Sequence, residues 1–335
     1  MSVHTRPATM RDVARKAGVS INSVLRVIHE QGDVDATAKA RILAAIEELN
    51  YHPRLVTNGV VRPRSNTVGI IIADITNPYF AAVVRGAQDM ARYHDAHVVL
   101  CNTNESQEEE LYHLQSLAEQ GVDGIIVFPG YYTSKNLAIV AEYFRPIVVI
   151  NHRFDHPNVS LVFTKNYEGA RLAVDHLVEQ GHRRIGMLAG RELAPTRGQR
   201  VRGFRDGLTA HGLPVIEEQI IGGAPTQESG YENALELLAQ CPDITAIFAY
   251  NDLMALGALK ACREMARRVP QECAIVGFDD TLFAALTMPA LTTIRLDKYT
   301  IGREAMSRLF DMLELPDTTF DPLELDVELV VREST

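Results

Sequence analysis

The sequence has no apolar run long enough to cross a membrane and no recognisable secretory leader. Apolar runs such as residues 68–73 and 124–128 are far shorter than the roughly 20 residues that a membrane helix needs. The first residues, MSVHTRPATMRD, contain no apolar stretch behind their basic side chains. We therefore expect a cytoplasmic protein with no membrane partner.

Paired cysteines and the common enzyme motifs are also missing. No GxGxxG, GxxxxGK[ST], GxSxG or HExxH motif occurs, and the close histidine pairs have no matching carboxylate or thiol spacing. The cysteines form no CxxC pair, which favours reduced thiols over disulfides or zinc ligands: they are Cys101, Cys241, Cys262 and Cys273. We expect no enzymatic activity, no metal and no cofactor.

Positive charge is scarce overall but concentrated at one end. The net charge is -10, which by itself argues against a nucleic-acid partner. Residues 1–64 nevertheless hold 10 Lys and Arg against 6 Asp and Glu, a charge of +4, whereas the remainder holds 23 against 37, a charge of -14. A basic head on an acidic body suits a protein whose head alone meets phosphate.

Helical patterns fill the first 50 residues, with no strand signal. Thr9, with Asp12 three positions later, is typical of a helix N-cap, and Gly18 ends this first helix. Ser20 can cap a second helix that runs to about residue 29. A third helix has Thr37 at its head and an apolar face of Ala38, Ile42, Ala45, Ile46 and Leu49. This order, with a tight glycine turn, predicts a helix-turn-helix head.

Two further regions follow the head. Between residues 50 and 66 lie two prolines, one glycine and three arginines, which indicates a linker with, at most, one short helix. From Thr67 onward, short β-branched runs alternate with longer amphipathic stretches, which predicts an α/β body of parallel sheets covered on both faces. The number of repeats favours two lobes. Ligands of such sheets bind in the crevice at the carboxyl ends of the strands.

A series of motifs then indicates a family. The head carries ATMRDVARKAGVSINSVLRVIH and IEELNYHP, and the body carries VGIIIADITNPYF, GVDGIIVF, QGHRRIGMLAG, AYNDLMALGA, ECAIVGFDD and PALTTIRLD. In order and spacing they resemble the lactose-repressor (LacI/GalR) family of bacterial transcriptional regulators over nearly the whole chain. The resemblance implies a helix-turn-helix head on a two-lobed, periplasmic-binding-protein-like domain with three crossovers between lobes.

The resemblance also implies domain limits and a side-by-side homodimer. Crossovers are expected near Phe163, Ile294 and Leu325. The expected parts are a DNA-binding head at 1–52, a hinge linker at 53–66, and an effector-binding and dimerisation domain at 67–335, with an N-lobe at about 67–162 and 294–324 and a C-lobe at about 163–293 and 325–335. No leucine heptad follows at the end of the chain, so we expect no tetramerising tail.

The second helix of the head is the expected reader of double-stranded operator DNA. Side chains near the N-terminus of such a helix reach base edges in the major groove. Asn22 can pair with adenine, Ile21 can press on a thymine methyl, and Arg26 lies one turn further on the same face. Residue type alone favours Asn22 and Arg26 as plain solvated helix residues; the resemblance reverses this and favours base contacts. With phosphate-contacting and hinge positions added, the expected DNA-binding residues are Thr9, Ser20, Ile21, Asn22, Ser23, Arg26, Thr37 and Val60.

Two positions depart from the family pattern. Leu25 stands where the family usually has a serine, and it either packs in the head or touches a base methyl. The family's hinge helix inserts a leucine into the minor groove, but here the matching residue is Val60. Gly59 beside it costs such a helix about 1 kcal/mol relative to alanine. A hinge that folds poorly on DNA and a plain flexible tether both remain open.

Polar and aromatic side chains follow several of the predicted strands and form the expected effector site. They offer carboxylates, amides, one guanidinium and aromatic faces, a set suited to a polyhydroxylated ligand: Asp74, Tyr79, Phe80, Asn151, Arg200, Asn251 and Asp279. Each also has a structural interpretation. Asp279 could cap a helix, Phe80 could be core, and Arg200 could pair with an acid.

The expected effector is a sugar or sugar derivative. Leu296 stands where sugar-responsive relatives often have a polar residue, and Lys165 with Arg200 favours an acidic ligand such as a sugar acid or phosphosugar. A pure solute-binding protein of the periplasmic type and an α/β enzyme are the competing classes. The basic head argues against the first, and the lack of a nucleophile–base pair or metal set argues against the second.

Overall fold

A computed structural model describes residues 10–28, 34–49, 64–130 and 133–335. The expected contacts at Thr9 and Val60, and residues 53–63 of the expected hinge, lie outside these ranges. Within them, no helix combines the length and apolar character that crossing a membrane requires.

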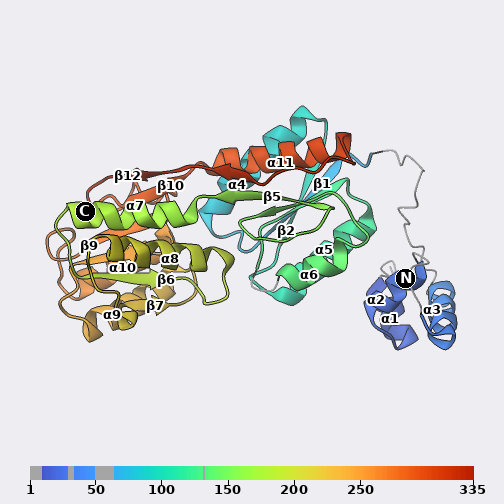
Figure 1. Ribbon diagram of the computed structural model, residues 1–335, viewed down its shortest axis with the longest axis horizontal. Coiled ribbons are helices and arrows are strands. Elements are labelled where there is room, and N and C mark those ends of the chain that lie inside the picture. The colour runs from blue at the N-terminus through green and yellow to red at the C-terminus, as the bar shows by residue number, and fades with distance from the viewer. Residues whose placement is uncertain (1–9, 29–33, 50–63, 131–132) are drawn as a thin grey trace, which may run out of the picture.

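The head packs α1 (Met10–Ala17), α2 (Ile21–Ile28) and α3 (Ala36–Glu48) around a small apolar core. Val13, Val24 and Ile42, one from each helix, are fully buried in it. Gly18 turns the chain between α1 and α2 with a φ of +65°, a backbone conformation that suits glycine. The predicted helix-turn-helix arrangement is confirmed (Figure 1).

The N-lobe is a parallel sheet in the order β11-β5-β4-β3-β1-β2. Helices α4 and α11 pack together on one face, and α5 and α6 contact each other on the opposite face (Figure 1). Its elements are β1 (Thr67–Ile72), α4 (Pro78–Tyr93), β2 (His97–Asn102), α5 (Gln107–Gln120), β3 (Gly124–Val127), α6 (Thr133–Val140), β4 (Ile147–Ile150), β5 (Val159–Thr164), α11 (Lys298–Glu314) and β11 (Leu323–Leu325).

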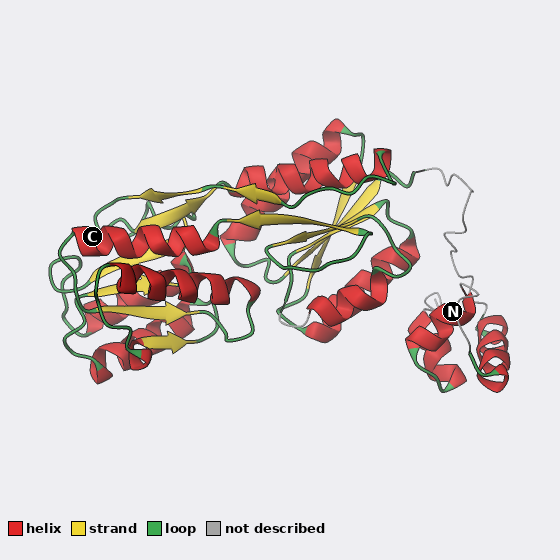
Figure 2. Cartoon of the chain, in the orientation of Figure 1, coloured by secondary structure: helices red, strands yellow, loops and turns green. Residues whose placement is uncertain are grey.

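The C-lobe repeats this plan with the order β12-β10-β9-β8-β6-β7, and Figure 2 shows its strands among helices. Only the β10–β12 pairing is antiparallel among the pairings of the described strands. Its elements are α7 (Asn166–Glu179), β6 (Ile185–Ala189), α8 (Pro195–Ala210), a 3-10 turn at Glu217–Gln219, β7 (Ile220–Gly222), α9 (Gln227–Gln240), β8 (Ala246–Ala249), α10 (Asp252–Glu264), β9 (Ala274–Asp279), β10 (Thr292–Leu296) and β12 (Val327–Val330).

The chain passes between the lobes at Lys165, Asp297 and Asp326. Phe163 and Ile294, near which crossovers are expected, lie within β5 and β10, and Leu325 ends β11, so the chain leaves each strand two, three and one residues later. The reason is that both strands keep their ladder partners to their last residue. Thr164 pairs with Leu325 in one sheet, and Leu296 pairs with Val327 in the other.

Close packing of α4 against α11 supports the N-lobe sheet from outside. A Cβ on Gly86 of α4 would lie 2.0 Å from the Tyr299 carbonyl oxygen of α11, and one on Gly302 would lie 1.9 Å from that of Val83. Only glycine allows the two helix backbones to approach so closely. The carboxyl ends of strands from both sheets face the same space between the lobes.

Candidate functional site

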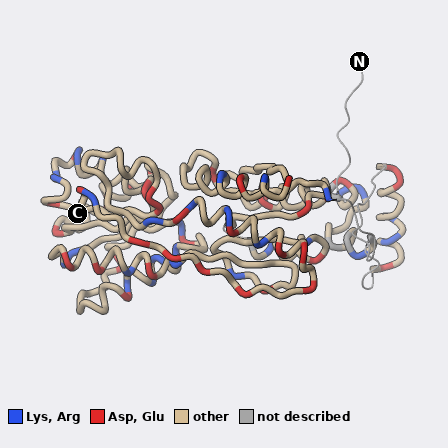
Figure 3. The backbone as a smooth tube through the Cα atoms, turned by 90° about the horizontal axis from the view of Figure 1, so that it is seen from above, with Lys and Arg blue, Asp and Glu red and all other residues tan. Residues whose placement is uncertain are grey.

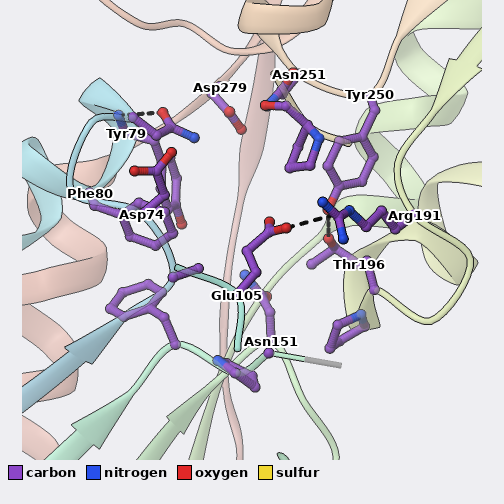
Figure 4. A pocket seen from close by; sticks show the side chains of 18 of the residues that line it. Asp74, Tyr79, Phe80, Glu105, Asn151, Arg191, Thr196, Tyr250, Asn251 and Asp279 are labelled. Carbon is purple, nitrogen blue, oxygen red and sulfur yellow. Dashed lines mark hydrogen bonds and ion pairs between the residues drawn. The ribbon is translucent and has the colours of Figure 1, made fainter. Parts of the chain in front are cut away.

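A cavity of about 360 Å³ lies between the lobes, at the carboxyl ends of strands from both sheets (Figure 4). The seven side chains expected at an effector site all line it. They follow β1, β4 and β8, end β9, or lie on α4 and α8. The strand-end argument thus brings together residues more than 200 positions apart, from Asp74 to Asp279.

The C-lobe wall centres on a buried ion pair. Arg200 and Asp279 are 5% and 6% exposed, and an Arg200 terminal nitrogen lies 3.7 Å from the Asp279 Oδ1. The Arg200 Nε donates to the Asn166 Oδ1 at 2.9 Å, and its Nη1 donates to the Tyr250 carbonyl oxygen. The guanidinium also stacks over the Phe278 ring, 3.6 Å from its centroid. Arg200 is therefore held rigidly from several sides.

Burial dominates the electrostatics of this wall. It raises the pKa of Asp279 to about 7, against the lowering effect of Arg200. Burial also raises the pKa of Tyr79, whose hydroxyl faces the same charges from the N-lobe. The neighbouring Asp252 is fully buried and accepts from the Thr281 N–H and the Thr293 hydroxyl, both at 2.6 Å. Asp252 thus holds the segment after β9 and the strand β10 together behind the wall.

Two amides at the pocket also have structural partners. The Asn251 Oδ1 caps α10 by accepting from the Met254 N–H at 2.9 Å, and its Nδ2 donates to the Pro225 carbonyl at 3.0 Å. The Asn151 Oδ1 accepts from the N–H of Thr164 at 2.7 Å, which ties the end of β4 to the first crossover. These hydrogen bonds fix the orientation of both side chains at the pocket surface.

The N-lobe wall is mainly aromatic. Tyr79, Phe80 and Phe128 meet edge to face, with ring centroids 5.1 to 6.4 Å apart. The Asp74 Oδ1 accepts from the N–H of Thr76 at 2.9 Å and so closes the loop after β1. Phe80 is half-buried and faces the cavity, so it is not simply a core residue.

Sequence reasoning missed several lining residues. Glu105 follows β2, Arg191 follows β6, and Tyr250 directly follows β8, so the strand-end rule could have found all three. Thr196 at the start of α8 shares a 2.5 Å hydrogen bond with the Tyr250 hydroxyl. Arg191 and Glu105 form an ion pair across the cleft, with the Arg191 Nε 3.5 Å from the Glu105 Oε2.

The expected cationic pair for an acidic ligand is wrong. Lys165 does not line the cavity; its ammonium lies 2.5 Å from Asp326 at the third crossover. Arg200 already faces Asp279. Leu296 is buried in β10 and does not line the cavity either. Among the described residues, no group of three or more His, Cys, Asp and Glu could hold a metal ion.

The head presents a second candidate surface. The Ser20 Oγ accepts from the Ser23 N–H at 3.1 Å, which starts α2 as predicted. Arg26 and Thr37 are exposed, whereas Ile21 packs partly on the head core. The described part of the head holds six Lys and Arg against four Asp and Glu (Figure 3). The side chains of Asn22 and Leu25 lie outside what the structure describes.

Comparison with known proteins places both regions. Residues 9–54 match the bacterial regulatory proteins of the lacI family, and residues 174–335 match a periplasmic binding protein-like domain. The chain is 33% identical to the HTH-type transcriptional repressor PurR of Pasteurella multocida over 98% of both chains. It is 34% identical to the ribose operon repressor of Halalkalibacterium halodurans, over 98% of this chain and 97% of the repressor.

Solved structures agree with this assignment. A complex of the transcriptional regulator CelR with cellobiose superimposes with a TM-score of 0.77 at 31% identity, covering 98% of this chain and 100% of that one. A lac repressor dimer bound to operator and an anti-inducer superimposes with a TM-score of 0.72 at 27% identity, covering 98% and 99%. The chain belongs to the LacI family of bacterial transcriptional regulators.

Proposed function

We propose that this chain is a repressor whose operator binding is controlled by a small polyhydroxylated ligand in the pocket between its lobes. The observation that carries the proposal is the convergence of carboxylates, amides and aromatic rings from both lobes on one cavity, in a chain with a helix-turn-helix head. A regulator of this kind works in the bacterial cytoplasm, where the operator lies.

The head supports DNA binding through α2. Arg26 is exposed on this helix, one turn beyond its N-terminus, where a guanidinium can reach a guanine edge or a phosphate. Ser20, Ser23 and Thr37 lie at the first turns of α2 and α3, where hydroxyls and N–H groups contact phosphates. Ile21 and Asn22 sit beside them at the start of α2.

Two heads are needed to read a near-palindromic operator, so the proposal includes a homodimer. The segment after β9 supports this, because it exposes Leu282, Phe283, Leu286 and Met288 within seven positions. Such a cluster is typical of a surface that a partner covers. The solved lac repressor relative is a dimer on its operator.

A neutral ligand suits the pocket better than the acidic one expected from the sequence. The two guanidinium groups that line it, Arg191 and Arg200, each face a carboxylate, Glu105 and Asp279. Asp74 adds a further carboxylate. Paired hydroxyls can bind to the carboxylates and amides while the C–H face of a sugar ring lies on the aromatic wall. These groups bind and orient, so the proposal includes no catalysis.

The mechanism follows from the position of the pocket. A ligand that contacts both lobes favours their closed arrangement. Closure in turn changes the spacing between the two hinges of the dimer. By linkage, the operator changes ligand affinity by the same factor as the ligand changes operator affinity, and such coupling is typically about 1–3 kcal/mol.

The first step is a thermal-shift screen of neutral sugars, sugar acids, phosphosugars and nucleosides. Two substitutions then test whether the head binds DNA and the pocket binds the ligand. We expect a neutral sugar to raise the melting temperature. Arg26→Ala should abolish a gel shift with DNA flanking the protein's own gene and keep this stabilisation, and Asp279→Ala should do the reverse. If both folded variants lose both properties, or if only sugar acids stabilise the protein, the assignment is wrong.

A further inference from the structure

Two residues that line the pocket form an ion pair that joins the two lobes directly. Glu105 belongs to the loop after β2 in the N-lobe, and Arg191 belongs to the loop after β6 in the C-lobe. Figure 4 shows the two side chains reaching toward each other across the cavity, with the Arg191 Nε 3.5 Å from the Glu105 Oε2. Because the residues follow strands of different sheets, separating the lobes at this point must break the pair.

The backbone before Glu105 is held in an unfavourable conformation that directs this side chain into the cleft. Asn104 and Glu105 have φ values of +50° and +59°, the left-handed region that non-glycine residues seldom occupy. The Asn102 Nδ2 donates to the Asn104 Oδ1 at 2.7 Å, and the Glu105 N–H donates to the Ala73 carbonyl at 3.2 Å. Two adjacent strained residues fixed in this way indicate a functional position.

The loop that carries Arg191 is braced on the opposite side. A Cβ on Gly190 would lie 2.9 Å from the Tyr250 ring, so glycine lets the loop lie directly against that ring. The Tyr250 hydroxyl shares a hydrogen bond with the Thr196 hydroxyl, and the Ala194 N–H donates to the Arg191 carbonyl at 3.0 Å. Arg191 therefore extends from a fixed base, as Glu105 does.

We propose that the Glu105–Arg191 ion pair is a latch that favours the closed arrangement of the lobes in the ligand-free protein. The proposal rests on the proposed function in that the pocket between the lobes is where the ligand enters. Arg191 is 51% exposed and Glu105 is 21% exposed in their side chains, so water screens the pair and salt weakens it. A latch of this strength shifts the population of closed molecules and still lets ligand in.

The test measures lobe opening in the ligand-free, full-length chain. Spin labels are attached through Tyr112→Cys on α5 and Glu228→Cys on α9, both exposed, in a background with Cys101→Ser and Cys241→Ser. Pulsed dipolar spectroscopy then gives the distance distribution between the lobes. Glu105→Gln and Arg191→Gln should each raise the ratio of long to short distances by about two- to five-fold, and 1 M salt should do so in the parent chain.

A double-mutant comparison separates the latch from local damage. The double variant E105Q/R191Q should open no further than either single variant, and the reversed pair E105R/R191E should restore the parent distribution. The matched control is Glu192→Gln, an exposed neighbour of Arg191 that should leave the distances unchanged. Unchanged distances in the single variants, additive effects, or no recovery in the reversed pair would overturn the proposal.

The outcome is independent of the ligand. A panel in which no sugar binds would overturn the proposed function and leave the distance measurement standing. Unchanged distances would remove the latch and leave ligand binding intact.

Discussion

The two walls of the pocket differ in their residues and in how those residues are held. The N-lobe wall is built from edge-to-face rings, Tyr79, Phe80 and Phe128, with Asp74 in a solvated loop. The C-lobe wall is built around Arg200 and Asp279, which are buried and interlocked. Losing one side chain from the N-lobe wall should therefore have only a local effect. Losing one from the C-lobe wall should lower the stability of the whole lobe.

The largest effect is expected from Arg200→Ala. Above pH 7, where Asp279 is mostly ionised, removing the guanidinium leaves its carboxylate buried without that partner, and breaking such a buried pair typically costs about 3–5 kcal/mol. Urea unfolding followed by circular dichroism measures this loss. Arg202→Ala is the matched control, because Arg202 is exposed on the same helix. Equal losses in the two variants would show that the buried ion pair is not the source of the lost stability.

A pH profile tests the same wall through Asp279→Asn. Burial raises the pKa of Asp279 from 3.8 to about 7, so the folded state favours the protonated carboxyl. This stabilising contribution is complete below the ordinary pKa and is lost as pH rises through about 7. The unfolding free energy of the parent should therefore fall between about pH 4 and 7, by on the order of a few kcal/mol, and that of the variant should fall less.

The remaining slope of the variant has its own source. Burial also raises the pKa of Asp252 to about 6, and this carboxyl stays in both proteins. Asp317→Asn, an exposed carboxylate in the turn after α11, should leave the parent profile unchanged. A variant of Asp279 whose profile coincides with that of the parent would show that this carboxyl titrates normally in the fold.

A substitution in the aromatic wall should change the affinity for the ligand. Phe80→Leu keeps an apolar side chain but removes the ring face, and we expect the Kd of the stabilising sugar to rise about tenfold, roughly 1.4 kcal/mol. Isothermal titration calorimetry measures the change. Tyr93→Leu is the control on the same helix, since Tyr93 is 81% exposed and does not line the cavity. A loss of global stability in place of affinity would place Phe80 in the core.

The smallest effect is expected from Asp74→Ala. This carboxylate accepts from Thr76 within its own exposed loop, so its loss should lower the unfolding free energy by only about 0.5–1.5 kcal/mol. Urea unfolding beside Asp279→Ala compares a carboxylate in each wall. If Asp74→Ala were the more damaging of the two, the contrast between solvated and buried walls would be reversed.

Much of the fold follows from local patterns. The β-branched runs at residues 68–73, 124–128 and 246–249 became β1, β3 and β8, because buried parallel strands need continuous apolar residues. The runs did not indicate β11 and β12, which are short, half-exposed and interrupted by Glu324 and Glu328. Such edge strands are stabilised by pairing with the neighbouring strand of the sheet, so no local hydrophobic pattern predicts them.

The site was predictable where it depends on strand ends and not where it depends on distant pairing. Asn151 and Asn251 follow strands and Asp279 ends one, so topology alone brings them to one cavity. The partner of Lys165 lies 161 residues away at Asp326, and this pairing removes the lysine from the ligand argument. The sequence contains no local signal for that contact.

The most direct measurement of the central claim is a pair of titrations on the full-length protein. Fluorescence anisotropy gives the operator Kd with and without the stabilising sugar, and calorimetry gives the sugar Kd with and without operator. If the pocket controls the head, both constants change, and by the same factor. An operator Kd that stays constant while the sugar saturates the pocket would contradict the account.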